Sequence, residues 1–244
     1  MPSIVWGRHP QEAYDNPYEY EAQKQFMREC KKLFAELIAK MGRYTLKYHR
    51  DERTLEKATW LLTIDLFSSL SDCAHLLEEK RHRPVARVFR DAVETIDLLR
   101  VLHSGTPKAE STLFKWYENQ TIAHSDSRKY IQEVEGEQAA LHRRTFYNEL
   151  SKFTHRTYRA LTDSVSLGRG DLMVHDSHGS GYLVLPQTIA AYMAVLADIS
   201  IQAAESAVTT SSLTMDEIQS IWNVALESHT VPRRFVMSVP FRDV

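Results

Sequence analysis

The stretch from Pro84 to Leu99, PVARVFRDAVETIDLL, decides the fold class because it carries two helical patterns at once. Its apolar side chains recur at spacings of three and four residues, which places them on one face of an α-helix. They are Val85, Val88, Phe89, Ala92, Val93, Ile96 and Leu99. Pro84 suits the first turn of such a helix, and Ser104-Gly105 is typical of its end. The stretch therefore predicts an amphipathic helix that opens at Pro84 and ends by residue 105.

A charged stripe lies opposite this apolar face. It consists of Arg83, Arg87, Arg90, Glu94 and Asp97. Guanidinium groups in a row could bind phosphate oxygens, and Glu94 could orient Arg90. The same row is also typical of a solvent-exposed helix face with internal ion pairs. Both interpretations stay open at this stage.

Helical spacing continues on both sides of this stretch, so we expect an all-α bundle of about seven helices. Two of them precede it, over residues 17–42 and 54–80. After it come a short helix that follows Pro107, a long tract that reaches about residue 164, and helices over 186–209 and 214–226. Gly136 could split the long tract. The scarcity of glycine supports this helical interpretation.

One short stretch interrupts the helical pattern. It contains four of the eight glycines, Gly168, Gly170, Gly179 and Gly181. Residues 171–175 and 182–185 are two short segments on either side of a turn. This arrangement predicts one small β-hairpin over 171–185. We expect a single domain over residues 1–244, with C-terminal helices over 187–228.

Composition narrows the classes of function. The chain of 244 residues holds 30 basic and 32 acidic side chains, so no global charge attracts nucleic acid and any such contact must be local. Its two cysteines, Cys30 and Cys73, lie inside helical patterns and indicate buried thiols in a reducing compartment. No apolar stretch has the length of a signal peptide or a membrane span. A soluble, cytoplasmic protein is the expectation.

Two sets of side chains resemble metal ligands. On the helix over 54–80 and just beyond it, Asp72, His75, Glu79 and His82 show the i, i+3 spacing of carboxylate-bridged sites. Such sites draw their ligands from several helices, so a solvated stripe is the preferred interpretation. His175, Asp176 and His178 lack a further cysteine or histidine nearby. We therefore expect no metal and no cofactor.

The run from Arg144 to Arg159, RTFYNELSKFTHRTYR, separates into three faces if it forms one helix. The apolar face holds Phe146, Leu150 and Phe153, and the water-facing flank holds Glu149, Lys152 and Arg156. The third face carries Tyr147, Ser151, His155 and Tyr158, with Arg144, Asn148 and Arg159 at its edges. These groups could hold a phosphate and transfer a proton, or they could form a polar seam between two helices.

Two histidines each precede an arginine by one helical turn: His124 precedes Arg128, and His155 precedes Arg159. Near neutral pH an imidazole can act as a general base or acid, and a neighbouring arginine can position a phosphodiester. In this interpretation His155 transfers the proton while Ser151 and Tyr147 form hydrogen bonds. Arg90, Arg128 or Arg159 would then hold phosphate. A structural role for both histidines is the alternative.

Three segments resemble the HEPN superfamily of helical bundles: 83–94, 119–126 and 147–155. The resemblance covers roughly residues 55–165. It implies a homodimer that cuts single-stranded RNA without a metal, or a noncatalytic helical partner of a toxin–antitoxin or antiphage defence system. A cognate antitoxin or defence partner is implied as well. If His124 is the family's motif histidine, Asn119 stands where the motif arginine would be.

Two functions follow as hypotheses. The first is a metal-independent endoribonuclease that uses His155, Ser151, Tyr147 and His124. The second is a noncatalytic interaction or ligand-binding protein, working as a homo-oligomer, in which the same polar stripes form a buried network or an interface. The near-neutral charge of the chain favours the second hypothesis, and the polar face of the 144–159 run favours the first.

Overall fold

A computed structural model describes residues 19–155, 157–158, 166–169, 172–175 and 186–225. The described residues form eight helices, so the prediction of an all-α bundle is confirmed. The helices are α2 (Glu19–Gly42), α3 (Leu55–Glu78), α4 (His82–Leu102), α5 (Pro107–Tyr117), α6 (His124–Glu135), α7 (Glu137–Thr154), α9 (Pro186–Thr209) and α10 (Met215–Ala225). None of them is both long and apolar enough to cross a membrane.

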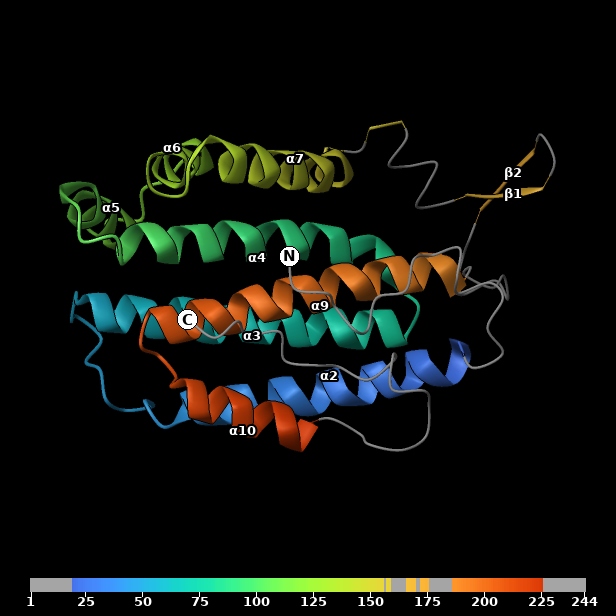
Figure 1. The fold of residues 1–244 in the computed structure, drawn as a ribbon, viewed down its shortest axis with the longest axis horizontal. Coiled ribbons are helices and arrows are strands. Elements are labelled where there is room, and N and C mark those ends of the chain that lie inside the picture. Colours follow the sequence, from blue (N-terminus) through green and yellow to red (C-terminus); the bar gives the residue numbers. More distant parts are fainter. Residues whose placement is uncertain (1–18, 156, 159–165, 170–171, 176–185, 226–244) are drawn as a thin grey trace.

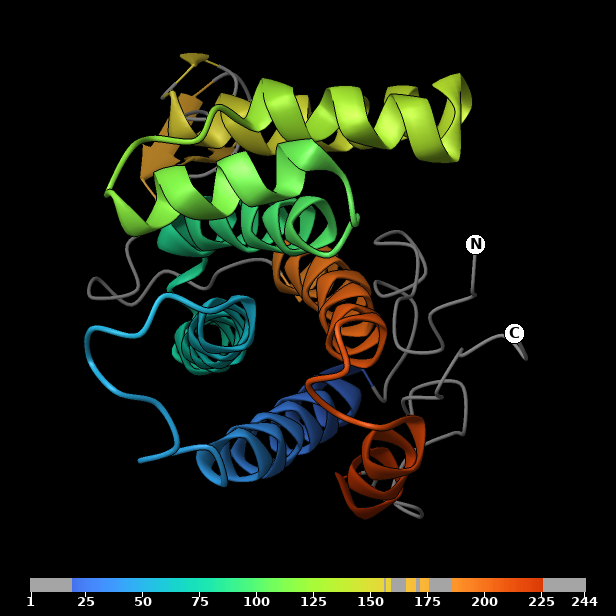
Figure 2. The ribbon, with the colours of Figure 1, turned by 90° about the vertical axis from the view of Figure 1, so that its left-hand side faces the viewer.

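The long helices stack in layers. Helix α3 packs against α2, α4 and α9, and the view along the bundle shows it end-on between them (Figure 2). Helix α10 lies beside α2, at the far side from α7 (Figure 1). Helices α5, α6 and α7 cover the outer side of α4, where α7 runs along the bundle and α6 runs across it (Figures 1 and 2).

One apolar cluster extends through the helices that surround α3. Its largest fully buried side chains include Trp222, Phe26, Phe34, Phe67 and Phe89. Cys30 and Cys73 are buried free thiols in this cluster, as predicted. Burial raises the pKa of Cys73 to about 12 and also raises that of Cys30, and nearby carboxylates add to both shifts. Neither thiol is therefore ionised at neutral pH.

Several helix ends follow from local chemistry that the sequence predicts. The Thr54 hydroxyl accepts a hydrogen bond from the backbone N–H of Lys57 at 3.2 Å and caps α3. At the start of α10, Thr214 and Glu217 cap each other's backbone N–H groups. Gly136, at φ +89°, splits the predicted long tract into α6 and α7.

Two predicted boundaries need correction. The run 144–159 is not one continuous helix, because α7 ends at Thr154 and His155 occupies its C-cap. Strand β2 (Leu172–His175) falls where a strand was predicted, but it pairs antiparallel with β1 (Ser166–Arg169). The predicted partner, 182–185, lies outside the described residues. A short polar segment can pair with either neighbour, so sequence alone does not select the register.

Candidate functional site

A partly buried polar network joins α4 to α6 and α7. We call it the α4–α7 network, and it consists of Arg90, Glu94, Asp97, His124, Arg143 and Tyr147. The residues from α4 follow spacings of four and three, and those from α7 a spacing of four, so each set occupies one helix face. Arg90 meets Tyr147 while Asp97 meets Arg143, which requires the two helices to run antiparallel.

Tyr147 anchors one end of this network. Its hydroxyl donates a hydrogen bond to Glu94 Oε1 at 2.6 Å and accepts one from Arg90 Nε at 3.0 Å. Arg90 Nε also lies 2.9 Å from Glu94 Oε1. Desolvation and the neighbouring Glu94 raise the pKa of Tyr147, so the hydroxyl stays protonated at neutral pH. The predicted orientation of Arg90 by Glu94 is present, but both are directed to Tyr147.

Asp97 anchors the other end and is completely buried. Arg143 donates to both carboxylate oxygens, from Nη2 to Oδ1 at 2.6 Å and from Nε to Oδ2 at 3.2 Å. His124 Nε2 lies 2.8 Å from Asp97 Oδ2. Arg143 and His124 are almost entirely enclosed as well. A buried carboxylate thus holds two cationic or donor side chains from two other helices.

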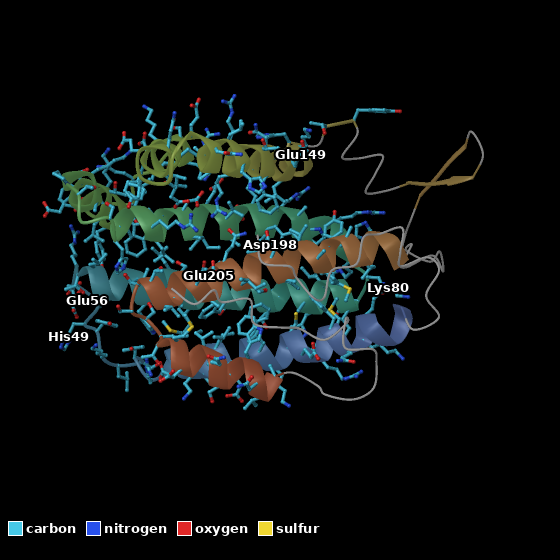
Figure 3. All side chains as sticks on the ribbon, viewed as in Figure 1. His49, Glu56, Lys80, Glu149, Asp198 and Glu205 are labelled. Atoms are coloured by element: carbon cyan, nitrogen blue, oxygen red, sulfur yellow. The ribbon has the colours of Figure 1, made fainter. Side chains whose placement is uncertain are left out.

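Helix α9 extends the network. Arg143 also donates to Gln202 Oε1, and Gln202 Nε2 donates to Asp198 Oδ2 at 3.0 Å. Asp198 lies on the part of α9 that faces the α4–α7 layers (Figure 3). Its pKa is raised, chiefly by burial. The contacts of Arg143 therefore tie α7 to both α4 and α9.

His124 lies inside the network and not on a surface. Its ring stacks on that of Tyr147 with 4.0 Å between centroids and 26° between planes. Its Nδ1 is buried with no hydrogen-bond partner among the described residues. Since Asp97 can only accept while ionised, His124 donates through Nε2. These contacts favour a structural role for His124, which is one of the two roles that the sequence left open.

The pKa of Asp97 is lowered. Burial alone would raise it, but the hydrogen bond from His124 and the charge and hydrogen bonds of Arg143 outweigh burial. Because the folded-state pKa is below the unfolded-state value of about 3.9, the stabilisation is fully present above that value. It is lost as pH falls through the folded-state pKa.

We therefore expect the stability difference between wild type and Asp97→Asn to shrink as the solution is acidified. Protonated Asp97 resembles asparagine in shape and charge, so the two proteins converge once the carboxylate takes up its proton. Urea unfolding at neutral pH and in steps down to about pH 3 measures this difference. A difference that stays constant over the whole range would contradict the assignment.

A basic groove lies between α6 and α7, on the outer side of the network. Its volume is about 760 Å³, and we call it the α6–α7 groove. Its charged residues are Arg128, Lys129, Arg144 and Glu137, so cations outnumber anions by three to one. Among the described residues, none of the three cations forms an ion pair with a carboxylate. The guanidinium carbon of Arg128 lies 5.6 Å from the centre of the Tyr147 ring, so a residue of the groove contacts a residue of the network.

The remaining candidates on α7 have different surroundings. Ser151 donates its hydroxyl proton to the carbonyl of Tyr147 at 2.8 Å, a bond within the helix. His155 is exposed, and within the described part of the chain its side chain has no hydrogen-bond or ion-pair partner. It follows Asn148 of the groove by seven residues, which places both on one side of α7. Arg159 lies outside the described residues.

The arginine row of α4 does not form one site. Arg90 belongs to the network, Arg87 is exposed, and Arg83 is half-buried. None of the three lines the α6–α7 groove. Asn119 is exposed in the link between α5 and α6, with φ +55°, and it too lies outside the groove lining.

The residues with metal-ligand spacing are dispersed. Asp72, His75 and Glu79 are exposed, whereas His82 is buried edge-on against Tyr192, with ring centroids 5.4 Å apart. Over the described ranges, no three His, Cys, Asp or Glu side chains come together in a way that could hold a metal ion. His175 has no described side chain, and Asp176 and His178 lie outside the described residues.

Sequence reasoning missed several residues of the site. In the network these are Arg143, Asp198 and Gln202, and in the groove they are Lys129, Gln132, Gln138 and Leu141. Arg143 stands one turn before Tyr147 on the same face, which is a usable signal. Asp198 and Gln202 are a polar pair, one turn apart, inside the mostly apolar stretch 189–204. A polar pair in such a stretch indicates a buried partner on another helix.

Comparisons of the chain with protein-family models, with curated proteins and with solved structures find no match.

Proposed function

We propose that the protein binds single-stranded RNA and holds the phosphate backbone in the α6–α7 groove. The observation that supports this most is the presence of three cations without carboxylate partners in one groove. The chain as a whole has a net charge of −2, so this excess is local and not a general property of the surface. Unpaired arginine and lysine side chains are the usual ligands of phosphate oxygens.

The other groove residues favour a single strand over a duplex. Leu141 is 59% exposed within the groove and offers an apolar surface to an unstacked base. Gln132, Gln138 and Asn148 add amide groups that can pair with base edges. A duplex would present mainly its backbone and would leave Leu141 unused.

The α4–α7 network would hold this groove in shape. The two walls of the groove belong to different helices, since α6 runs across the bundle and α7 runs along it (Figure 1). His124 begins α6, Tyr147 and Arg143 belong to α7, and all three meet on α4. Rigid walls reduce the entropy that a ligand must overcome on binding.

Replacement of both Arg128 and Arg144 by alanine should weaken RNA binding at least tenfold. The reason is the loss of two phosphate contacts, which should also reduce the slope of log affinity against log salt by about 1.4. Fluorescence anisotropy of a labelled single-stranded RNA, titrated at several salt concentrations, measures both quantities. Arg50→Ala, an exposed arginine in the turn before α3, is the matched control.

Two outcomes would overturn the proposal. The first is an absence of binding by the wild-type protein at low salt. The second is equal affinity of the wild type and the double variant. Arg87→Ala distinguishes RNA binding in the groove from RNA binding on the arginine row of α4. If the groove is the site, this variant should have the wild-type affinity for RNA.

Cleavage of the bound RNA by His155 is a second candidate function. It is favoured by the exposure of His155 on the side of α7 that carries Asn148, about 10 Å further along the helix. A HEPN-like nuclease needs no metal, so wild-type protein should cut single-stranded RNA in the presence of EDTA, and His155→Ala should not. RNA that is bound but left intact supports a noncatalytic binding protein instead.

A further inference from the structure

A second pocket lies where α2 ends and α3 begins. Its volume is about 300 Å³. It is lined by the turn after α2, the first two turns of α3, the C-cap residue of α4 and the link between α9 and α10. Glu56, one of its lining residues, and His49 of the preceding turn mark this end of the molecule (Figure 3). We call it the turn pocket, and it shares no lining residue with the α6–α7 groove.

The wall of the turn pocket is held by a buried lysine. Lys57 donates from Nζ to the carbonyls of His49, Arg50 and Glu52 at 2.8, 2.6 and 2.9 Å. Leu46, in the same turn, is 97% exposed and has φ +70°, a conformation that bulky side chains rarely adopt. Neither its exposure nor its backbone strain stabilises the fold. Strain of this kind is common where a segment is shaped for binding.

Two aromatic rings form one side of the pocket. Tyr48 and Trp60 are both half-buried, with centroids 5.6 Å apart and an interplanar angle of 38°. The Trp60 indole donates to the carbonyl of Met41 at 3.0 Å, which fixes the ring. Half-buried rings in a fixed orientation offer a face on which a flat ligand can stack.

His103 supplies a hydrogen-bond acceptor of defined orientation. The Thr59 hydroxyl donates its one proton to the carbonyl of Leu55 at 2.7 Å, so it accepts from His103 Nε2 at 2.8 Å. The proton therefore resides on Nε2. Burial lowers the pKa of His103, against an opposing effect of Glu56, so the ring is neutral at pH 7. His103 Nδ1 is left with a lone pair that can accept from a ligand N–H.

Lys47 supplies a positive charge at the rim. Its Nζ lies 5.0 Å from the ring centre of Tyr44 and 5.4 Å from that of Tyr48. In the described part of the chain it has no carboxylate partner. An exposed ammonium group beside an aromatic stacking face suits a ligand that is flat at one end and anionic at the other.

We propose that the turn pocket binds a mononucleotide whose base carries an exocyclic amino group. The base stacks on Tyr48 and Trp60, its amino group donates to His103 Nδ1, and its phosphate lies beside Lys47. The pocket size matches the lower end of small-molecule sites. This site is independent of RNA binding in the α6–α7 groove.

Isothermal titration calorimetry on the full chain tests the proposal with three probes. Adenosine 5′-monophosphate should bind, and inosine 5′-monophosphate, which has a carbonyl in place of the amino group, should bind at least fivefold more weakly. Adenosine, which lacks the phosphate, should also bind more weakly. Lys47→Ala should lower the affinity for the monophosphate but leave that for adenosine nearly unchanged, whereas Tyr48→Leu should weaken both.

The matched control is Lys40→Ala, an exposed lysine of α2 that does not line the pocket. Lys47 is exposed, so its variant should fold, and circular dichroism confirms this before titration. No binding of any probe by wild-type protein overturns the proposal. Equal binding by Tyr48→Leu, Lys47→Ala and wild type does so too. RNA affinity measured on the Tyr48→Leu variant should remain at the wild-type value, which separates this site from the groove.

Discussion

Replacing Asp97 by alanine is expected to lower the free energy of unfolding by about 3–5 kcal/mol. Asp97 is completely buried and accepts hydrogen bonds from Arg143 and His124. Its removal takes away the carboxylate that Arg143 contacts directly. The enclosed guanidinium then keeps a hydrogen bond to the neutral amide of Gln202, and Asp198 is a charge that it does not contact directly. Urea unfolding followed by circular dichroism measures the loss.

Controls separate the charge effect from the loss of a side chain. Asp72→Ala, on the exposed side of α3, should change stability little. The double variant Asp97→Ala with Arg143→Ala should lose less than the sum of the two single variants, because it leaves no unpaired charge. A stable Asp97→Ala protein, or strictly additive losses, would show that this pair does not hold α7 on α4.

Replacing Lys57 by methionine is expected to cost roughly 2–4 kcal/mol, the second largest effect. Methionine keeps most of the apolar stem but donates no hydrogen bond. The carbonyls of His49, Arg50 and Glu52 then lose their shared partner, and the turn after α2 is no longer held against α3. Thermal and urea unfolding measure the cost.

The same variant should also abolish nucleotide binding in the turn pocket, because Tyr48 and Lys47 lie in the released turn. Lys32→Met, on the exposed side of α2, is the matched control and should leave both properties unchanged. The variant could instead unfold at the same urea concentration as the wild type. Water would then stabilise the three carbonyls in the variant as much as Lys57 does in the wild type. The assigned role of Lys57 would then be wrong.

Most of the helical architecture follows from the sequence. The spacing of Phe89, Val93 and Ile96 predicts the buried face of α4, and all three are buried in the core. Thr54 and Pro107 mark helix starts where they were expected. These features depend on residues within one or two turns of each other, so local chemistry is sufficient to predict them.

The end of α7 and the pairing of the two strands could not be predicted from the sequence. The polar run 144–159 keeps its helical spacing beyond Thr154, where the helix stops. Periodicity identifies which faces a helix would have, but it does not determine how far the helix continues.

Of the candidate site, the sequence identified several members, but it did not identify Arg143, Gln202 or Lys129, nor which side chains contact each other. Tyr147 and His124 were proposed as chemically active, and the structure places both in a partly buried network with Glu94 and Asp97. Arg128 and Arg144 gather in the groove with Lys129 because Gly136 turns the chain between α6 and α7. The catalytic roles of His155, Ser151, Tyr147 and His124 remain predictions.

The sequence by itself determined which segments are helical and which faces of them are apolar, and it indicated Gly136 as a place where a helix could break. Each of these depends on neighbours along the chain, through backbone hydrogen bonds and side-chain spacing. Only the tertiary structure decided which charges are neutralised and which face a groove. A row such as Arg83, Arg87 and Arg90 has one helical geometry in sequence, yet Arg90 meets Tyr147 of another helix while Arg87 meets solvent. That difference arises because the partner of a charge is chosen by packing between helices, which the spacing within one helix does not encode.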